Sequence, residues 1–547
     1  MPNTPSVKFN FINNNVEESS PLQGISTVLA RTIKGPAVDP SILISSISQF
    51  RRIYGKELVP DGSYSNIEQA LRGGSKLRII RVMGATSKQG EVGNLFKIKI
   101  GSKEASLKLV TRGFGDPIGT GNTFTVTTTK QGNTLYYTVL DANQTVLESG
   151  PVFSYMTADA NNPTSVDYLA LSLWINTNPY FKASIDTKAP ELGSIEKFLT
   201  WIAGVDNTKT VIEVTPTASL TGSIGVVGTQ PTLQLYKDAA DTVRDYTDSY
   251  NILASHVSDN LNSSDTLQLY KYLKDICDEL NEFRLFIEIP KYIAGSTTPM
   301  NVEKMIEWKN QCNSTIGYSK WVSYYGSGLI YNNEFGIPQP SDVGGTVLGL
   351  ADSSATNFGY DKSFAGLNRG VVTDAQGPVS PNYGSPGRVS DLEKLAQANI
   401  NVFVVRDTPS FGKRVVLWHN FTDQVKQDSF RFLGNIGLVL NIKKTLRPIL
   451  ESYLEEPNIW NTWRAIYLRV RPYIDAWVDA NALTDPKWNG DQDANSWKDL
   501  KVNNEADCRQ GKYRVVFSFK DVVALQEITM DLVIEKSSKS VDVSVGK

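Results

Sequence analysis

Histidine is the side chain whose ordinary pKa lies nearest neutral pH, and this chain has two, His256 and His419. His256 lies in a stretch with helical spacing, and His419 follows a strand-like run. A Ser-His-Asp or Cys-His catalytic arrangement would need one of them, but neither is near a recognisable nucleophile motif, and G-x-S-x-G is absent. We therefore predict that the chain is not an enzyme. Two histidines in 547 residues also argue against a histidine-based metal site.

Two other segments resemble ligand-binding loops only loosely. Gly115–Asn122 is rich in glycine but lacks the lysine of a phosphate-binding loop, so we expect a hairpin loop there. Asp491 and Asp493 lie between asparagines but do not have EF-hand spacing, and we expect a plain turn. The carboxylates are numerous, and a buried acid pair stays open at this point. No cofactor is predicted.

Cysteine and charge content narrow the class of protein further. The three cysteines are widely spaced without a C-x-x-C pair, which argues against disulfides and zinc and favours a reducing compartment. The chain has 55 basic and 57 acidic residues, so nothing indicates a nucleic-acid-binding surface. The sequence contains no run of 18 apolar residues, so we predict no membrane-spanning helix. We interpret two local basic clusters as solvated faces or intersubunit ion pairs: Lys76, Arg78 and Arg81, and Lys443, Lys444 and Arg447.

The periodicity divides the chain into five parts, and its length predicts two to four domains. Residues 21–84 alternate strands with short helices, and residues 236–525 return to this pattern, so we expect one discontinuous α/β (α+β) core domain. Residues 85–235 contain short strands between Gly, Asn and Thr turns, which predicts an inserted, mainly β domain. Residues 1–20 and 526–547 are expected to form extended terminal arms.

Several elements can be predicted individually. Ser48 should cap a helix that ends at Gly55. We expect helices over 241–262 and 265–281, and a long helical stretch over 429–454 with a break at Pro448. Residues 341–350 are rich in glycine and small enough to pack closely.

Both arms carry apolar residues at every second position, which predicts strands. These residues are Val7, Phe9 and Phe11 at one end, and Ile528, Met530, Leu532 and Ile534 at the other. A terminal strand on a polar tether has no partner of its own, and it could pair with the sheet edge of a neighbouring subunit. A frayed terminus is an equal alternative for the N-terminal segment.

Several segments, taken in order, resemble the contractile tail sheath family. Gly35-Pro36 and the run from Pro40 to Gly55 are similar to its opening loop, strand and helix, and Leu77–Gly84 to the strand before its inserted domain. S-F-A-G-L-N-R-G, which contains Ala365, Gly366, Arg369 and Gly370, resembles the family's P-A-G-x-x-R-G, with Phe364 in place of proline. Asn401 and Trp418 lie in segments similar to L-N-x-x-G-I-N and V-x-x-W-G-x-R-T, although His419-Asn420-Phe421 replaces the usual glycine and arginine. Arg447–Trp463 resembles a helix with E-P-N before a tryptophan.

The resemblance implies a structural subunit of a phage tail sheath, part of the virion and assembled in the host cytoplasm. Such subunits form hexameric rings that stack helically around a tail tube, and the arms link neighbours by strand addition. The inserted domain would face outward, and one-way contraction of the metastable polymer would drive the tube through the host envelope for genome ejection. The implied partners are the chain itself, the tail tube protein, and baseplate and tail terminator proteins.

Two other interpretations stay open from sequence. One is the sheath of a phage-derived contractile injection system, or another tail or baseplate protein. The other is a hydrolase with a β accessory domain, which the tryptophans permit but for which no catalytic arrangement was found.

Overall fold

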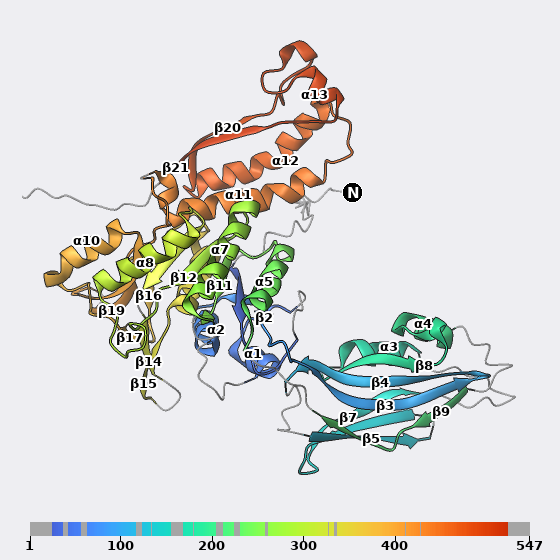
Figure 1. Ribbon diagram of the computed structural model, residues 1–547. Coiled ribbons are helices and arrows are strands. Elements are labelled where there is room, and N and C mark those ends of the chain that lie inside the picture. The colour runs from blue at the N-terminus through green and yellow to red at the C-terminus, as the bar shows by residue number, and fades with distance from the viewer. Residues whose placement is uncertain are drawn as a thin grey trace, which may run out of the picture.

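The computed structural model describes residues 24–36, 42–55, 63–115, 123–132, 134–154, 168–178, 180–203, 212–223, 230–257, 261–326, 328–332, 336–410, 412–426 and 428–522. Figure 1 shows a central α/β lobe, a β-rich lobe on one side and a helical lobe with a strand pair on another. The predicted mixed α/β class is confirmed. The domain boundaries at 84/85, 235/236 and 525/526 stay predictions.

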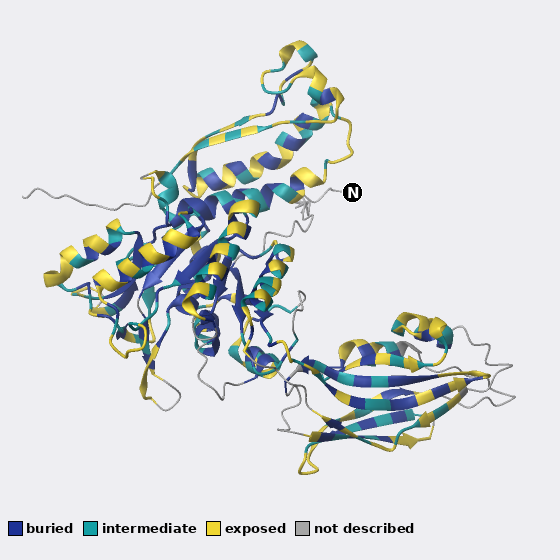
Figure 2. Cartoon of the chain, viewed as in Figure 1, coloured by how far each residue is buried: buried dark blue, intermediate teal, exposed yellow. Residues whose placement is uncertain are grey.

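The central lobe is built on an eight-stranded sheet with the order β16-β19-β18-β13-β12-β11-β1-β2. Six neighbouring strands, from β18 to β2, run parallel, and β19 and β16 are added antiparallel. Most of these strands are buried along most of their length, as both-face coverage requires (Figure 2). Their bounds are β1 Ile25–Ala30, β2 Lys76–Arg81, β11 Asn251–Ala254, β12 Arg284–Glu288, β13 Val322–Gly326, β16 Val371–Val372, β18 Ile400–Thr408 and β19 Gly412–Leu417.

Helices cover both faces of this sheet, because alternate side chains of each strand point to opposite sides. Leu285 and Ile287 of β12 pack in one core with α5, α7, α8 and α10, whereas Phe286 packs in a second core with α1, α2 and α9. The helices are α1 Ile47–Tyr54, α2 Ser63–Arg72, α5 Leu233–Asp241, α7 Ser263–Leu280, α8 Val302–Ile316, α9 Gly344–Phe358 and α10 Val389–Gln397. A small sheet of β14 Leu329–Asn332, β15 Pro338–Ser341 and β17 Ala375–Pro378 lies beside them.

The β-rich lobe consists of two four-stranded antiparallel sheets, β10-β5-β6-β7 and β8-β4-β3-β9, around one apolar core. Two helices pack on this core. The bounds are β3 Gln89–Ile100, β4 Lys103–Phe114, β5 Thr123–Gln131, β6 Thr134–Leu140, β7 Val146–Ser154, α3 Tyr168–Thr177, β8 Phe181–Thr187, α4 Ile195–Ala203, β9 Ile212–Pro216 and β10 Ser219–Ser223.

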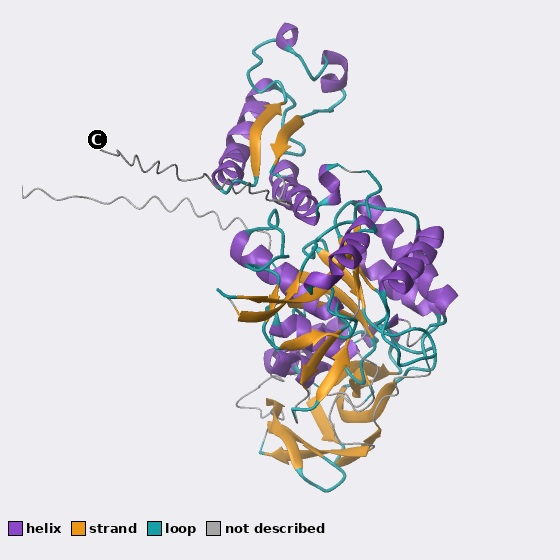
Figure 3. Cartoon of the chain, turned by 90° about the vertical axis from the view of Figure 1, so that its left-hand side faces the viewer, coloured by secondary structure: helices purple, strands orange, loops and turns teal. Residues whose placement is uncertain are grey.

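The helical lobe follows the central sheet and has its own apolar core. The antiparallel pair β20–β21 packs on α12, as the side view in Figure 3 also shows. Its elements are α11 Leu433–Glu451, α12 Trp460–Asp479, β20 Leu483–Asn489, α13 Glu505–Arg509 and β21 Val516–Asp521. Among the described helices, none is both long enough and apolar enough to span a bilayer.

The structure corrects four of the predicted elements. The expected helix over 241–262 contains strand β11, which is fully buried between β1 and β12, so burial in the sheet overrides the local helical pattern. Of the expected hairpin loop Gly115–Asn122, residues 116–122 lie outside the described part of the chain, but β4 and β5 on either side belong to different sheets and do not pair as a hairpin. The cap of α1 is Ser46, whose side chain accepts from the backbone N–H of Gln49. Helix α11 continues past Pro448, since Ile449 is buried in the core of this lobe.

Candidate functional site

Two of the sequence motifs of the C-terminal half lie side by side: residues 363–370, and the segment of Trp418 that follows β19. The Gly366 N–H donates to the carbonyl oxygen of Leu417 over 2.8 Å, and the Leu417 N–H donates to that of Gly370 over 2.8 Å. Residues 363–370 are thereby tied to the end of β19, directly before Trp418. Gly366 has a φ of +86°, and a Cβ atom on Gly370 would lie 2.7 Å from the Leu417 carbonyl oxygen. Both positions therefore require glycine.

Arg369 and Phe364 stabilise the loop 363–370 through a hydrogen bond inside the loop and a buried ring. The Arg369 Nε donates to the carbonyl oxygen of Ser363 over 2.6 Å, and its guanidinium lies 5.8 Å from the ring centre of Phe358. Phe364, at the position where the resemblance expected proline, is 2% exposed and packs near Phe286. The substitution therefore adds an aromatic ring to the core under the sheet.

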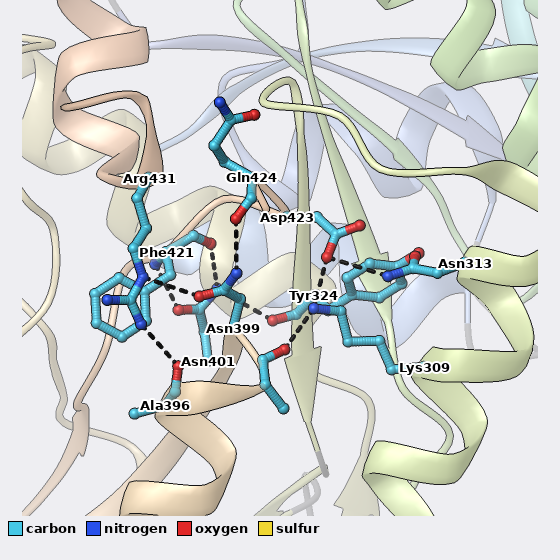
Figure 4. Close-up of polar contacts among 11 residues, drawn as sticks. Lys309, Asn313, Tyr324, Ala396, Asn399, Asn401, Phe421, Asp423, Gln424 and Arg431 are labelled. Atoms are coloured by element: carbon cyan, nitrogen blue, oxygen red, sulfur yellow. Dashed lines mark hydrogen bonds and ion pairs between the residues drawn. The ribbon is translucent and has the colours of Figure 1, made fainter. Parts of the chain in front are cut away.

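Asn401 connects two strands with the segment that follows β19 (Figure 4). Its Nδ2 donates to the carbonyl oxygens of Tyr324 over 3.1 Å and Phe421 over 2.8 Å, and its Oδ1 accepts from the Phe421 N–H over 2.7 Å. The side chain is fully buried. The two bonds to Phe421 pair both of its backbone groups, and the bond to Tyr324 adds a contact to a strand that is already part of the sheet.

A buried ion pair lies next to Asn401 in the same view. Lys309 of α8 is 2.6 Å from Asp423 Oδ1, and both side chains are at most 5% exposed. Asn313 Nδ2 also donates to Asp423 Oδ1 over 3.2 Å, while the Tyr324 hydroxyl donates to Asn313 Oδ1 over 2.8 Å. Burial lowers the pKa of Lys309 and raises that of Asp423, and their mutual attraction opposes both shifts. No sequence motif pointed to this pair, because its members are 114 positions apart.

Two arginines and one histidine of the site lie against aromatic rings. The Arg431 guanidinium lies 4.3 Å from the ring centre of Phe421 and donates to Asn399 and Ala396, and Arg406 lies 4.1 Å from the ring centre of Trp418. His419 stacks on Phe421 with ring centres 5.2 Å apart. Burial, and then Arg431 and Arg406, lower the pKa of His419 to about 4. The imidazole is therefore neutral at pH 7 and packs as an aromatic ring.

A cavity of about 490 Å³ lies between this site and the helical lobe. Both motif segments line it, together with the first turn of α11 and Val522, the last described residue of the chain. Asn435 in this lining donates to Asp521 at the end of β21 over 2.9 Å. The site therefore lies beside Val522, at which the described part of the chain ends.

Comparison with solved structures identifies this architecture. The sheath tail protein of Listeria innocua matches with a TM-score of 0.50 at 11% identity, over 91% of this chain and 95% of that protein. The chain has the fold of a contractile tail sheath protein. The sheath tail protein of Desulfitobacterium hafniense has a TM-score of 0.48, 12% identity and coverage of 94% and 100%. The contracted helical sheath of the anti-feeding prophage has a TM-score of 0.42, 14% identity and coverage of 57% and 78%. No protein-family model and no curated protein matches the chain.

The first family-like motif lies at the opposite end of the sheath fold, beside the β-rich lobe. The buried Arg81 donates to the carbonyl oxygens of Gly35, over 2.6 Å, and Thr32, and burial lowers its pKa to about 10. Gly35 and Gly55 have φ of +109° and +93°, and a Cβ atom on Gly113 of β4 would lie 2.7 Å from the Gly35 carbonyl oxygen. Pro36 is the last described residue before residue 42. This motif thus packs against the base of the β-rich lobe.

The interpretation of the basic clusters holds for Lys76, which is exposed, but was wrong for the other five residues. Arg78 forms an ion pair with Asp248 within the same chain, and Arg81 is buried as just described. The cluster Lys443, Lys444 and Arg447 surrounds Glu282, whose side chain is 4% exposed. These residues tie the helical lobe to the central sheet, because Glu282 lies between α7 and β12 and the basic residues lie on α11.

Of the remaining predicted positions, the cysteines and Asp491 are described by the structure and the arm residues are not. Cys277, Cys312 and Cys508 are buried free thiols. Asp491 accepts from the backbone N–H groups of Lys501, Val502 and Asn503, which agrees with a structural turn, and the described residues contain no cluster of metal-binding side chains. All seven arm residues lie outside the described part of the chain: Val7, Phe9, Phe11, Ile528, Met530, Leu532 and Ile534.

Proposed function

We propose that the chain is the structural subunit of a contractile phage tail sheath, which polymerises as stacked hexameric rings around the tail tube. The observation that carries this proposal is the fold match to the Listeria innocua sheath tail protein, which extends over 91% of this chain and 95% of that protein. Contraction of the polymer would drive the tube through the host envelope. The partners would be further copies of the chain, the tail tube protein, and the baseplate and tail terminator proteins.

The architecture suits rigid-body movement. The β-rich lobe, the central sheet and the helical lobe each have an apolar core of their own, so each lobe could keep its internal packing while the subunit is displaced and its interfaces change. The β-rich lobe would face outward. The energy for contraction would be stored during assembly, so the proposal requires neither a cofactor nor a catalytic residue.

The β20–β21 pair is suited to receive arms from neighbouring subunits. Among the described residues it contains only these two strands, so both of its outer edges lack a partner strand. Open edges of this kind accept an added strand through backbone hydrogen bonds. The alternating segments around Phe9 and Met530 would supply such strands, one from each of two neighbours. The first four family-like motifs would act as structural joints within the subunit.

The cellular setting follows from the same proposal. The subunit would be assembled in the host cytoplasm and would function in the virion tail. Three buried free thiols are compatible with a reducing compartment. The formal net charge of −2 supports neither nucleic-acid binding nor a strongly cationic surface.

Negative-stain electron microscopy of the purified chain at high concentration tests this function. Striated tubes or stacked rings with six-fold end views are expected, either from the chain alone or on co-expression with a tail tube protein. A chain that stays monomeric in both preparations would contradict the proposal. The identity of the neighbouring genes separates a phage tail from a phage-derived injection system.

A further inference from the structure

A second cavity, of about 470 Å³, opens beyond the carboxyl ends of β11 and β12, between α7 and α8. The six parallel strands stand in the order β2-β1-β11-β12-β13-β18, so the direction of chain progression reverses between β1 and β11. In open parallel sheets, ligands bind outside the carboxyl ends of the strands near such a reversal. The cavity borders β11, one of the two strands at this reversal, although none of its described lining residues follows β1.

The two basic groups at the cavity are both held by one carboxylate. Asp342 Oδ2 lies 2.9 Å from His256 Nε2, and Asp342 Oδ1 lies 2.9 Å from Lys291 Nζ. His256 follows β11 with a φ of +50°, not within a helix as predicted. Asp342 thereby holds both basic groups, and the attraction of His256 also lowers the pKa of the other carboxyl group of the cavity.

That second carboxyl group is Glu288, at the end of β12. Its Oε1 accepts from Asn66 Nδ2 over 2.9 Å and from the Gly344 N–H over 2.7 Å. Within the described ranges no hydrogen bond reaches its Oε2, and the same holds for the hydroxyl of Tyr270, a residue that is 4% exposed. Burial, and then Asp342, raise the pKa of Glu288 to about 7. The cavity thus holds an acidic group with spare hydrogen-bonding capacity, and the two basic groups that line the cavity contact Asp342.

The rest of the lining is largely apolar. Trp308 and Tyr270 contribute aromatic surface, and Leu261, Leu267, Ile293 and Met300 contribute aliphatic surface. Aromatic faces attract cations as well as alkyl chains. A pocket with apolar walls and a few convergent polar groups is the usual form of a small-ligand site.

We propose that this cavity binds a primary alkylammonium group, with the nitrogen between Glu288 Oε2 and the Tyr270 hydroxyl and the alkyl chain along the wall formed by Trp308. The same chemistry can come from a free alkylamine or from a lysine side chain of a second copy of this chain. The proposal does not depend on the sheath function, because it concerns the single subunit.

Calorimetric titration of the full-length subunit with n-pentylamine and with neutral n-pentanol, at pH 8, tests the ligand class. We expect the amine to bind at least tenfold more tightly than the alcohol. Glu288→Gln keeps the oxygen that accepts from Asn66 and Gly344, and it should abolish this preference while leaving pentanol binding unchanged. Glu393→Gln, at an exposed position on α10, is the matched control and should behave as wild type. Equal affinities for amine and alcohol, or an amine preference that survives in Glu288→Gln with an unchanged circular dichroism spectrum, would overturn the proposal.

Sedimentation velocity distinguishes the two sources of the ammonium group. If a lysine of a second copy occupies the cavity, saturating n-pentylamine should shift wild-type self-association to higher protein concentration, and Glu288→Gln should already show that shift without amine. If self-association is the same with and without amine, while calorimetry shows the Glu288-dependent preference, the occupant is a free amine.

Discussion

Gly345 of α9 lies directly on the backbone of Asn66 in α2, and the Asn66 side chain accepts from the Gly345 N–H over 3.0 Å. A Cβ atom on Gly345 would overlap the Asn66 carbonyl oxygen. The amide of Asn66 also donates to Ser255 and Glu288. This contact therefore joins two helices of one face to the ends of two central strands, and the small residues predicted over 341–350 are what permit it.

Gly345→Ala should lower the free energy of unfolding by about 2 kcal/mol or more, because overpacking against backbone cannot be relieved by a side-chain rotation. Urea denaturation followed by circular dichroism measures the change. Gly387→Ala is the control, since nothing lies within 4 Å of a Cβ atom there. Equal stability of the two variants would show that α2 and α9 can separate at no cost.

Asn401→Ala should destabilise the subunit by about 3 kcal/mol, because it leaves both backbone groups of Phe421 without their partner and removes one hydrogen bond to the Tyr324 carbonyl. The comparison is with Asn461→Ala on the exposed side of α12, which should change stability by no more than about 0.5 kcal/mol. Thermal unfolding of both variants checks this. A melting temperature of Asn401→Ala equal to that of the control would contradict the role assigned to Asn401.

The pair Lys309–Asp423 should show strong coupling in a double-mutant cycle. Lys309→Met or Asp423→Asn alone leaves one buried group without its partner and should cost about 3–5 kcal/mol. The double variant should be less unstable than the sum of the two single variants, by at least about 1 kcal/mol. Urea denaturation of the four proteins measures the coupling, and additive effects would mean that the two charges do not stabilise one another.

His419 should make the subunit less stable in acid. Its pKa is lowered to about 4 in the folded chain, whereas an unfolded histidine has a pKa near ~6.5. Its contribution is therefore fully present above pH ~6.5 and is lost as the pH falls toward 4, by up to about 3 kcal/mol. His419→Phe keeps the stacking on Phe421 and should flatten this part of the stability profile. Unfolding at a series of pH values measures it, and parallel profiles for wild type and variant would refute the assignment.

Deletion of Ile528–Lys547 should leave a folded subunit that does not polymerise, because the added strand is lost while the described cores stay intact. Circular dichroism would report the fold, and electron microscopy with the tube protein would report assembly. A matched variant that replaces Ile528, Met530, Leu532 and Ile534 by serine should fail to assemble at full length. Long ordered tubes from the truncated chain would show that the C-terminal arm is not the joint.

Local signals were strong enough to predict much of this protein from sequence. The α/β class, most strands, the helix ended by Gly55 and the close packing of residues 341–350 follow from periodicity, glycine position and residue size. These properties depend on neighbours along the chain. The same reasoning gave the order of the two C-terminal motifs along the chain, but it did not predict that they contact each other.

Only the tertiary structure decided the features that depend on distant residues. Strand β11 appeared helical because four residues carry little periodic information, and its burial between β1 and β12 determines its conformation. The three basic residues of α11 appeared to be solvated until Glu282 was found among them. Asp423 is one of 57 acidic residues in the sequence, and its pairing with Lys309 becomes visible only when α8 packs on the sheet. Desolvation and ion pairing are set by distance in space, which the sequence pattern does not encode.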